Sequence, residues 1–207
     1  MNGFTCCNGT ALESSTKLQD SIYFRSADNA ALYVNLYVPS TLTWAERNVV
    51  VKQSTNYPYA DTTRLSIKGG GKFDIKVRVP KWATGGFFVK INGKDKEVQA
   101  APGTYLTIGS TWQDGDTIEL KMPFGFYLSP VMDQPNIAGI FYGPVLLAAE
   151  EPEARSTWRP LTLDAGDLGK SITGDPGALR FSTNGVNLKP FFGTYGRYSV
   201  YFDVTLK

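Results

Sequence analysis

Residues 31–38 read Ala-Leu-Tyr-Val-Asn-Leu-Tyr-Val, a run whose side chains alternate with a period of two. Aromatic and branched aliphatic residues with this period are typical of a β-strand. The pattern begins at Ile22 and recurs along most of the chain, between turn residues at short intervals. It predicts strands at residues 22–24, 31–38, 48–53, 64–68, 73–79, 87–91, 105–108, 117–122, 124–128, 137–150, 178–182, 186–192 and 198–206.

Turn residues separate these segments and indicate how the strands are arranged. Asn92-Gly93 lies between two strand-like runs and is a strong hairpin signal, because both residues tolerate positive φ. Asp114-Gly115-Asp116 turns the chain in a similar way before residues 117–122. Turns at such short spacing favour a sandwich over a β-α-β layout. The sequence therefore predicts an all-β fold of one or more antiparallel β-sandwiches.

One short helix is expected at the N-terminal end, in residues 8–20. Thr10 followed by Glu13 fits the capping box, in which the two residues satisfy exposed backbone N–H groups reciprocally. Beyond residue 150 the cluster Glu151-Pro152-Glu153 opens a stretch through Pro176 that is expected to be rich in loops. Three closing strands are expected after it.

Composition limits the classes of partner. The 207 residues are 42% hydrophobic, which suffices for the core of one large all-β domain or two small ones. The 21 basic and 19 acidic residues are spread without runs, so no footprint for nucleic acid or anionic lipid is expected. No apolar stretch reaches the length of a bilayer span, and the first five residues lack the pattern of a signal peptide. We expect a soluble chain without a nucleic-acid or membrane partner.

The cysteines are the most distinctive candidates for chemistry. The chain has no histidine, which excludes histidine-dependent triads and histidine metal ligands within it. Cys6 and Cys7 are its two cysteines, and adjacent cysteines are poorly placed to bridge each other. A helix that starts just after them would stabilise a thiolate, so the pair could bind zinc or supply a nucleophile. Alternatively, each is a small buried hydrophobe, and a tetrahedral zinc site would need about two more ligands.

Aromatic side chains near predicted turns and strand ends are a second group of candidates. Such rings could stack on sugar faces, although tryptophan and tyrosine also commonly close the ends of a sandwich core. No pair of carboxylates is singled out as a glycosidase acid and nucleophile. Asp114, Asp116 and Glu119 are accounted for by turn formation and solvation. The aromatic candidates are Trp44, Tyr57, Tyr59, Trp82, Trp112 and Trp158.

Several short motifs together resemble one enzyme family. Residues 5–10 read Thr-Cys-Cys-Asn-Gly-Thr, residues 12–17 Leu-Glu-Ser-Ser-Thr-Lys and residues 20–24 Asp-Ser-Ile-Tyr-Phe, and they precede the run 31–38. Over roughly residues 4–150 the sequence resembles the C-terminal part of the β-L-arabinofuranosidase family, glycoside hydrolase family 127, and its close relatives. Further matches in family order are the motifs at 56–58, 77–82, 91–93, 112–116 and 142–146.

The resemblance implies a domain organisation and a mechanism. In that family an (α/α)6 barrel that carries the sugar site precedes β-sandwich domains. Residues 1–25 would then be the end of the catalytic barrel, 26–150 a β-sandwich domain, and 151–207 a loop-rich extension whose closing strands pack on the sandwich. The resemblance implies that Cys6 is the catalytic nucleophile and that Cys6 and Cys7 are zinc ligands. A glutamate would act as general acid and base, and the reaction would retain configuration through a thioglycosyl intermediate.

The sequence also departs from the family pattern. The upstream barrel, with the acid/base glutamate and the remaining glutamate and cysteine ligands, is not in these 207 residues, and Ser15 replaces an expected histidine. We therefore expect this chain alone to be inactive and to bind no zinc. Its function would belong to a parent hydrolase acting on a carbohydrate with terminal β-L-arabinofuranosyl or related sugars. The surface left by the barrel is expected to promote self-association. The alternative is a non-catalytic carbohydrate-binding or structural β-sandwich module.

Overall fold

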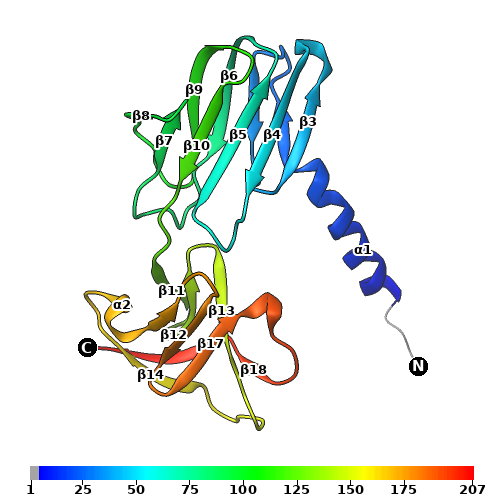
Figure 1. The fold of residues 1–207 in the computed structure, drawn as a ribbon. Helices are drawn as coiled ribbons and strands as arrows, with labels where there is room; N and C mark the ends of the chain where they lie inside the picture. Colours follow the sequence, from blue (N-terminus) through cyan, green and yellow to red (C-terminus); the bar gives the residue numbers. More distant parts are fainter. Residues whose placement is uncertain (1–4) are drawn as a thin grey trace. The chain divides into compact units, whose positions relative to one another are not determined.

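The computed structural model describes residues 5–207, and the prediction of an all-β, sandwich-like fold is confirmed (Figure 1). The chain forms two compact units. Unit 1 consists of Met1–Tyr57 and Thr62–Lys121, and unit 2 consists of Pro58–Asp61 and Met122–Lys207. Each unit has β-sheets of its own, so each is described separately.

Helix α1 spans Thr5–Asp20 and begins earlier than predicted. Thr10 lies inside this helix, where its Oγ1 donates a hydrogen bond to the carbonyl oxygen of Cys6 at 3.0 Å. The prediction that Thr10 caps the helix is therefore wrong, and the cysteine pair lies in the first described turn rather than before it. All described side chains from Cys6 to Asp20 are exposed, including those of Leu12 and Leu18. Of the described helices, none is long and apolar enough to cross a membrane.

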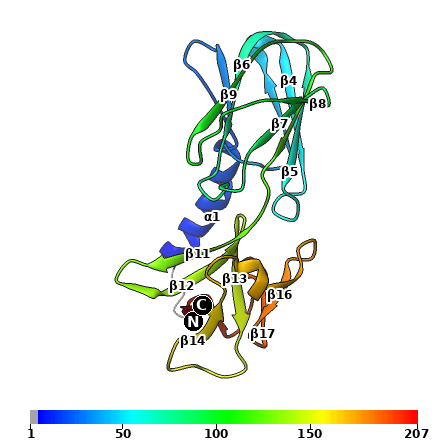
Figure 2. The same cartoon turned by 90° about the vertical axis from the view of Figure 1, so that its left-hand side faces the viewer.

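Two β-sheets form the layers of unit 1, as Figure 2 shows. The four-stranded sheet has the order β1 (Tyr23–Arg25), β2 (Ala31–Val34), β6 (Gly71–Arg78) and β9 (Tyr105–Trp112). The six-stranded sheet has the order β3 (Ser40–Trp44), β4 (Val49–Thr55), β5 (Thr62–Lys68), β10 (Thr117–Lys121), β7 (Phe88–Ile91) and β8 (Lys94–Lys96). The short 3₁₀ helix η1 (Ala45–Arg47) follows β3. All these strand pairs are antiparallel except β2 and β6.

Alternating side chains build the core of unit 1. Along β6 the side chains of Phe73, Ile75 and Val77 are buried and those between them are not, as the period of two requires. The opposite layer contributes Trp44, whose ring lies edge-on to that of Phe73 at 5.4 Å. The two sheets therefore share one hydrophobic core, which is the defining feature of a β-sandwich.

The predicted Asn92-Gly93 hairpin is confirmed. Both residues have positive φ, 51° and 77°, and they join β7 to β8 with Ile91 opposite Lys94. The Asn92 side chain also holds a neighbouring turn, because its Nδ2 donates to Asp116 Oδ1 at 2.8 Å. The residues that favour this turn in sequence are thus the ones that fix it in space.

Unit 2 is built on one nine-stranded sheet. Its main order is β14 (Arg159–Leu163), β19 (Phe202–Leu206), β12 (Gln134–Tyr142), β13 (Val145–Glu150), β17 (Val186–Pro190), β16 (Arg180–Thr183) and β15 (Thr173–Asp175). Strand β11 (Phe126–Val131) pairs with β12, and β18 (Tyr198–Ser199) pairs with β13. Two short helices, α2 (Leu168–Ser171) and η2 (Phe191–Gly193), complete the unit.

Some predicted boundaries in unit 2 are wrong. Residues 137–150 form two strands, because Gly143 adopts φ 52° and turns the chain so that Tyr142 lies opposite Val145. The stretch expected to be rich in loops contains β14, which pairs in parallel with β19. Strands from both sides of residue 150 thus share one core, and the compact units divide at Lys121 and Met122, inside the range 26–150.

Candidate functional site

The two predicted site cysteines lie side by side at the start of α1. Cys6 and Cys7 are free thiols on an exposed part of the helix, and their Sγ atoms are 3.8 Å apart. Both thiols are therefore accessible from solvent. Within residues 5–207, no group of three or more histidine, cysteine, aspartate or glutamate side chains could hold a metal ion.

The spacing of the two thiols fits one zinc ion. Two sulfurs bound at about 2.3 Å with tetrahedral angles lie about 3.8 Å apart, which is the separation of the Cys6 and Cys7 Sγ atoms. A structural zinc site of this kind has about four ligands. The separation of the two thiols is therefore compatible with a shared metal ion, and a four-ligand site would need further ligands.

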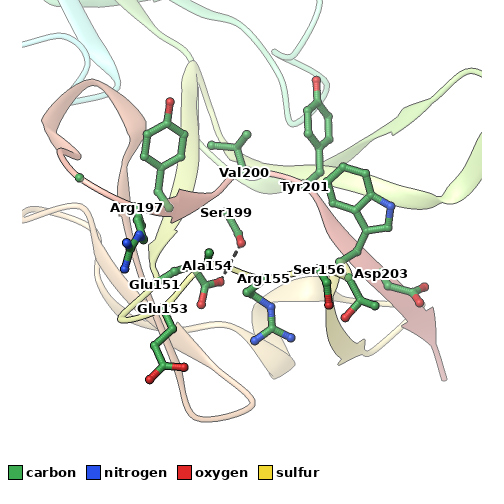
Figure 3. Close-up of a pocket in the computed structure, with 14 residues that line it drawn as sticks. Glu151, Glu153, Ala154, Arg155, Ser156, Arg197, Ser199, Val200, Tyr201 and Asp203 are labelled. Atoms are coloured by element: carbon green, nitrogen blue, oxygen red, sulfur yellow. Dashed lines mark hydrogen bonds between the residues drawn. The ribbon is translucent and has the colours of Figure 1, made fainter.

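A second candidate site is a pocket in unit 2 with a volume of about 970 Å³. Two segments that are far apart in sequence line it, residues 151–158 and residues 196–203. Figure 3 shows Arg155 and Ser156 on the first segment and Arg197 and Tyr201 on the second. The pocket combines aromatic rings with both basic and acidic side chains.

Glu151 holds the two segments together. Its buried carboxylate accepts hydrogen bonds from Arg159 Nε at 2.9 Å, from Arg159 Nη2 and from Ser199 Oγ at 2.7 Å. Its backbone N–H donates to the carbonyl oxygen of Arg197 at 3.0 Å. The hydrogen bonds from Arg159 hold the pKa of Glu151 below its ordinary value. All of these contacts are internal, so Glu151 has a structural role in the pocket.

Replacing Glu151 with glutamine is expected to destabilise unit 2 by about 2–3 kcal/mol, because the substitution leaves the partly buried Arg159 without its counter-charge. A carboxylate with a lowered folded pKa stabilises the protein above its unfolded pKa, about 4.3, and this contribution is lost as pH falls through the folded value. Urea unfolding at pH 7 and pH 3 would measure both effects.

Only the wild type should lose the stabilisation from the Glu151 carboxylate between pH 7 and pH 3. The difference in unfolding free energy between wild type and Glu151→Gln should therefore be smaller at pH 3. The control is Glu153→Gln, which neutralises an exposed neighbour on the same segment. Equal unfolding free energies for wild type and Glu151→Gln at pH 7 would contradict the structural role of Glu151.

Five of the six aromatic candidates fall into two groups. Trp44 and Trp112 are buried in unit 1, and Trp82 stacks on Tyr57 with ring centroids 6.5 Å apart, as expected for residues that close a sandwich core. Trp158 is the tryptophan with a largely exposed ring, and it lines the pocket of unit 2. Sequence reasoning missed Tyr198 and Tyr201, which line the same pocket but belong to a predicted closing strand.

Comparison with known proteins gives one match to a family model. Residues 31–124 match the family model described as the β-L-arabinofuranosidase GH127 middle domain. No curated protein matches the sequence. The matched range covers most of the described β-strands of unit 1.

Solved structures with a similar fold include three glycoside hydrolases. One described as a glycoside hydrolase aligns with a TM-score of 0.76 and 20% identity over 98% of this chain and 40% of its own. A GH127 β-L-arabinofuranosidase from Geobacillus stearothermophilus T6 aligns with a TM-score of 0.70 and 21% identity, over 91% of this chain and 35% of its own. A GH127 β-arabinofuranosidase aligns with a TM-score of 0.68 and 21% identity, over 89% of this chain and 36% of its own. This chain thus spans at most 40% of each of these proteins.

Proposed function

We propose that this chain is the β-sandwich part of a glycoside hydrolase of the GH127 type, acting on a carbohydrate with terminal β-L-arabinofuranosyl or related sugars. The observation that carries the proposal is the match of residues 31–124 to the GH127 middle domain. A fold similar to that of a glycoside hydrolase over 98% of the chain supports it. The sandwich is the scaffold, and the reaction depends on the cysteine pair on α1.

In this proposal Cys6 is the nucleophile. Its sulfur attacks the anomeric carbon, a C–S bond forms, and the glycosidic C–O bond breaks as the leaving oxygen takes a proton from a general acid. Water, which gives its proton to the conjugate base of the same acid, then displaces the sulfur as a thiolate, so that two inversions retain configuration. The first described turn of α1 keeps the thiol accessible.

Zinc held by Cys6 and Cys7 would keep the sulfur deprotonated at neutral pH. The spacing of the two thiols supports this assignment. Two ligands are too few for a stable four-ligand site, so we propose that the isolated 207-residue chain neither retains zinc firmly nor turns over substrate. Its partner is the remainder of the enzyme, which supplies the general acid and the other ligands.

Zinc is expected to protect both thiols at once. In the 207-residue chain, excess zinc should slow alkylation of Cys6 and of Cys7 by iodoacetamide roughly tenfold, because a metal-bound thiolate is a weaker and less accessible nucleophile. Mass spectrometry of the N-terminal peptide gives the two rates. A Cys6→Ser variant should lose most of the protection of Cys7, since one thiol remains.

The matched control is Ser14→Ala, which changes an exposed residue two turns further along the same helix. It should keep the protection of wild type. Independent protection of Cys7 in Cys6→Ser would contradict a shared zinc ion. Hydrolysis of an aryl β-L-arabinofuranoside by the 207-residue chain with zinc would contradict the proposal that the isolated chain is inactive.

A further inference from the structure

The pocket of unit 2 has the size and the walls of a ligand site, and the proposed chemistry at the cysteines does not use it. Its volume of about 970 Å³ lies near the upper end of the range for small-molecule sites, roughly 300–1,000 Å³. From its lining we infer that this pocket binds a short, uncharged oligosaccharide segment, several residues long, through the rings of Trp158, Tyr198 and Tyr201.

These three rings are exposed yet held in place. Trp158, Tyr198 and Tyr201 are 52%, 43% and 44% exposed. The ring of Trp158 lies edge-on to that of Tyr201, with centroids 6.1 Å apart, and Phe191 supports Tyr198 in the same way at 5.1 Å. An edge-to-face pair covers one face of one of its two rings and leaves the other faces free, while it restricts both side chains. Open, fixed ring faces suit the flat C–H surfaces of sugar rings.

A break between two strands brings Tyr198 and Tyr201 to one pocket. In an unbroken strand, residues three apart point to opposite faces of the sheet. Here β18 pairs with β13, with Tyr198 opposite Glu150, whereas β19 pairs with β12 and β14. The chain bends at Val200 between these pairings, so both tyrosines line the same pocket. In Figure 3 the labelled Tyr201 and Ser199 point in opposite directions from this segment.

The pocket rests on a rigid base. The carboxylate of Glu151 binds Arg159 and Ser199, and its backbone N–H binds the carbonyl oxygen of Arg197, so both lining segments are joined below the rings. A site that is ordered before binding loses less conformational entropy when the ligand arrives. The hydrogen bond drawn between Ser199 and Glu151 in Figure 3 is part of this base.

The charges of the pocket favour an uncharged, hydroxylated ligand. The lining has two basic residues, Arg155 and Arg197, and two acidic residues, Glu153 and Asp203. The charge of Glu151 is neutralised by its ion pair with Arg159. A phosphate-rich ligand would meet as much negative as positive charge. Sugar hydroxyl groups both donate and accept hydrogen bonds, so guanidinium and carboxylate groups can each bind them. The pocket therefore fits a neutral glycan better than a nucleotide.

Binding can be tested on the full 207-residue chain by affinity electrophoresis in gels that contain arabinan, arabinogalactan or xylan. At least one of these neutral polysaccharides is expected to retard the wild type. Trp158→Ala should weaken the association with that polysaccharide about tenfold or more, and Tyr201→Ala should weaken it to a similar degree, because each removes a stacking surface. Isothermal titration with fragments of the retarding polysaccharide gives the association constants.

The control is Tyr195→Ala, which removes a tyrosine that is 83% exposed in the same unit but does not line the pocket. It should bind like wild type, and all three variants should keep the melting temperature of wild type within a few degrees. A wild type that none of the three polysaccharides retards would overturn the inference. So would wild-type affinity in Trp158→Ala, or an equal loss of affinity in Tyr195→Ala. Neither Cys6 nor zinc takes part, so these outcomes are separate from those of the proposed function.

Discussion

A Cys6→Ser substitution in an enzyme that contains this chain is expected to lower kcat/KM at least about 10³-fold, because a serine hydroxyl cannot replace a thiolate as nucleophile. The loss should be in kcat, since Cys6 acts on the anomeric carbon after the sugar is bound. The assay uses an aryl β-L-arabinofuranoside and the longest reading frame, read from genomic DNA, that contains residues 1–207. Mass spectrometry of the quenched wild-type reaction should detect a pentosyl adduct on Cys6.

The variant Ser14→Ala serves again as the control, because Ser14 is exposed and lies on the same helix as the cysteines. It should keep the activity of wild type. Wild-type turnover in Cys6→Ser would exclude Cys6 as the nucleophile. An in-frame stop codon directly before the Met1 codon would instead favour the non-catalytic carbohydrate-binding or structural module.

The Trp112→Ala substitution is expected to destabilise unit 1 by about 3–5 kcal/mol, since it empties the space of a large, fully buried ring. Trp112 is 1% exposed and ends β9. Its Nε1 donates a hydrogen bond to the carbonyl oxygen of Phe73 at 2.9 Å, so the substitution also removes a contact between two strands of the same sheet. Chemical denaturation followed by circular dichroism measures the loss.

A Trp112→Phe variant separates the contribution of the buried ring from that of the hydrogen bond. It keeps most of the ring volume but removes the indole N–H, so it should lose about 1–2 kcal/mol. Trp158→Ala, which truncates an exposed ring in unit 2, should change the unfolding free energy of unit 1 very little. A loss below about 1 kcal/mol in Trp112→Ala would contradict the burial of this ring.

The period-two alternation of side chains and the residue types at turns are enough to predict many strands of unit 1. The hairpin at Asn92-Gly93 was predictable because two successive positive φ values need residues of this type. Strand β3 was missed because its sequence, Ser-Thr-Leu-Thr-Trp, is mostly polar and buries only Trp44. Its β structure comes from antiparallel pairing with β4, a long-range contact that a local pattern does not contain.

Unit 2 was predicted less well for the same physical reason. Residues 137–150 carry no charged residue before Glu150, so composition alone did not distinguish one long strand from two strands joined at Gly143. Strand β14 contains Arg159 and Pro160, which weaken a local strand pattern, and it lies at the edge of the sheet, where it depends on parallel pairing with β19. Pairing of this kind becomes visible only in three dimensions.

The candidate sites differ in how far sequence could find them. The cysteine pair was identifiable because the two residues are adjacent and the chain has no other cysteine. The pocket of unit 2 was not, because its walls come from segments about forty residues apart in the chain. Of its three rings only Trp158 was a candidate. Tyr198 and Tyr201 read as ordinary strand residues, since the bend at Val200 leaves no signal in the local sequence.

The position of β19 between β14 and β12 sets the order in which the two units can fold while the protein is being synthesised. On the ribosome, every strand of the unit 1 sandwich has been translated once Lys121 has been added, so its two layers can close early. The sheet of unit 2 has a gap between β12 and the edge strand β14 until Phe202–Leu206 have emerged. Until then the facing edges of β12 and β14 lack a partner, and the nascent chain exposes apolar side chains that a chaperone could recognise.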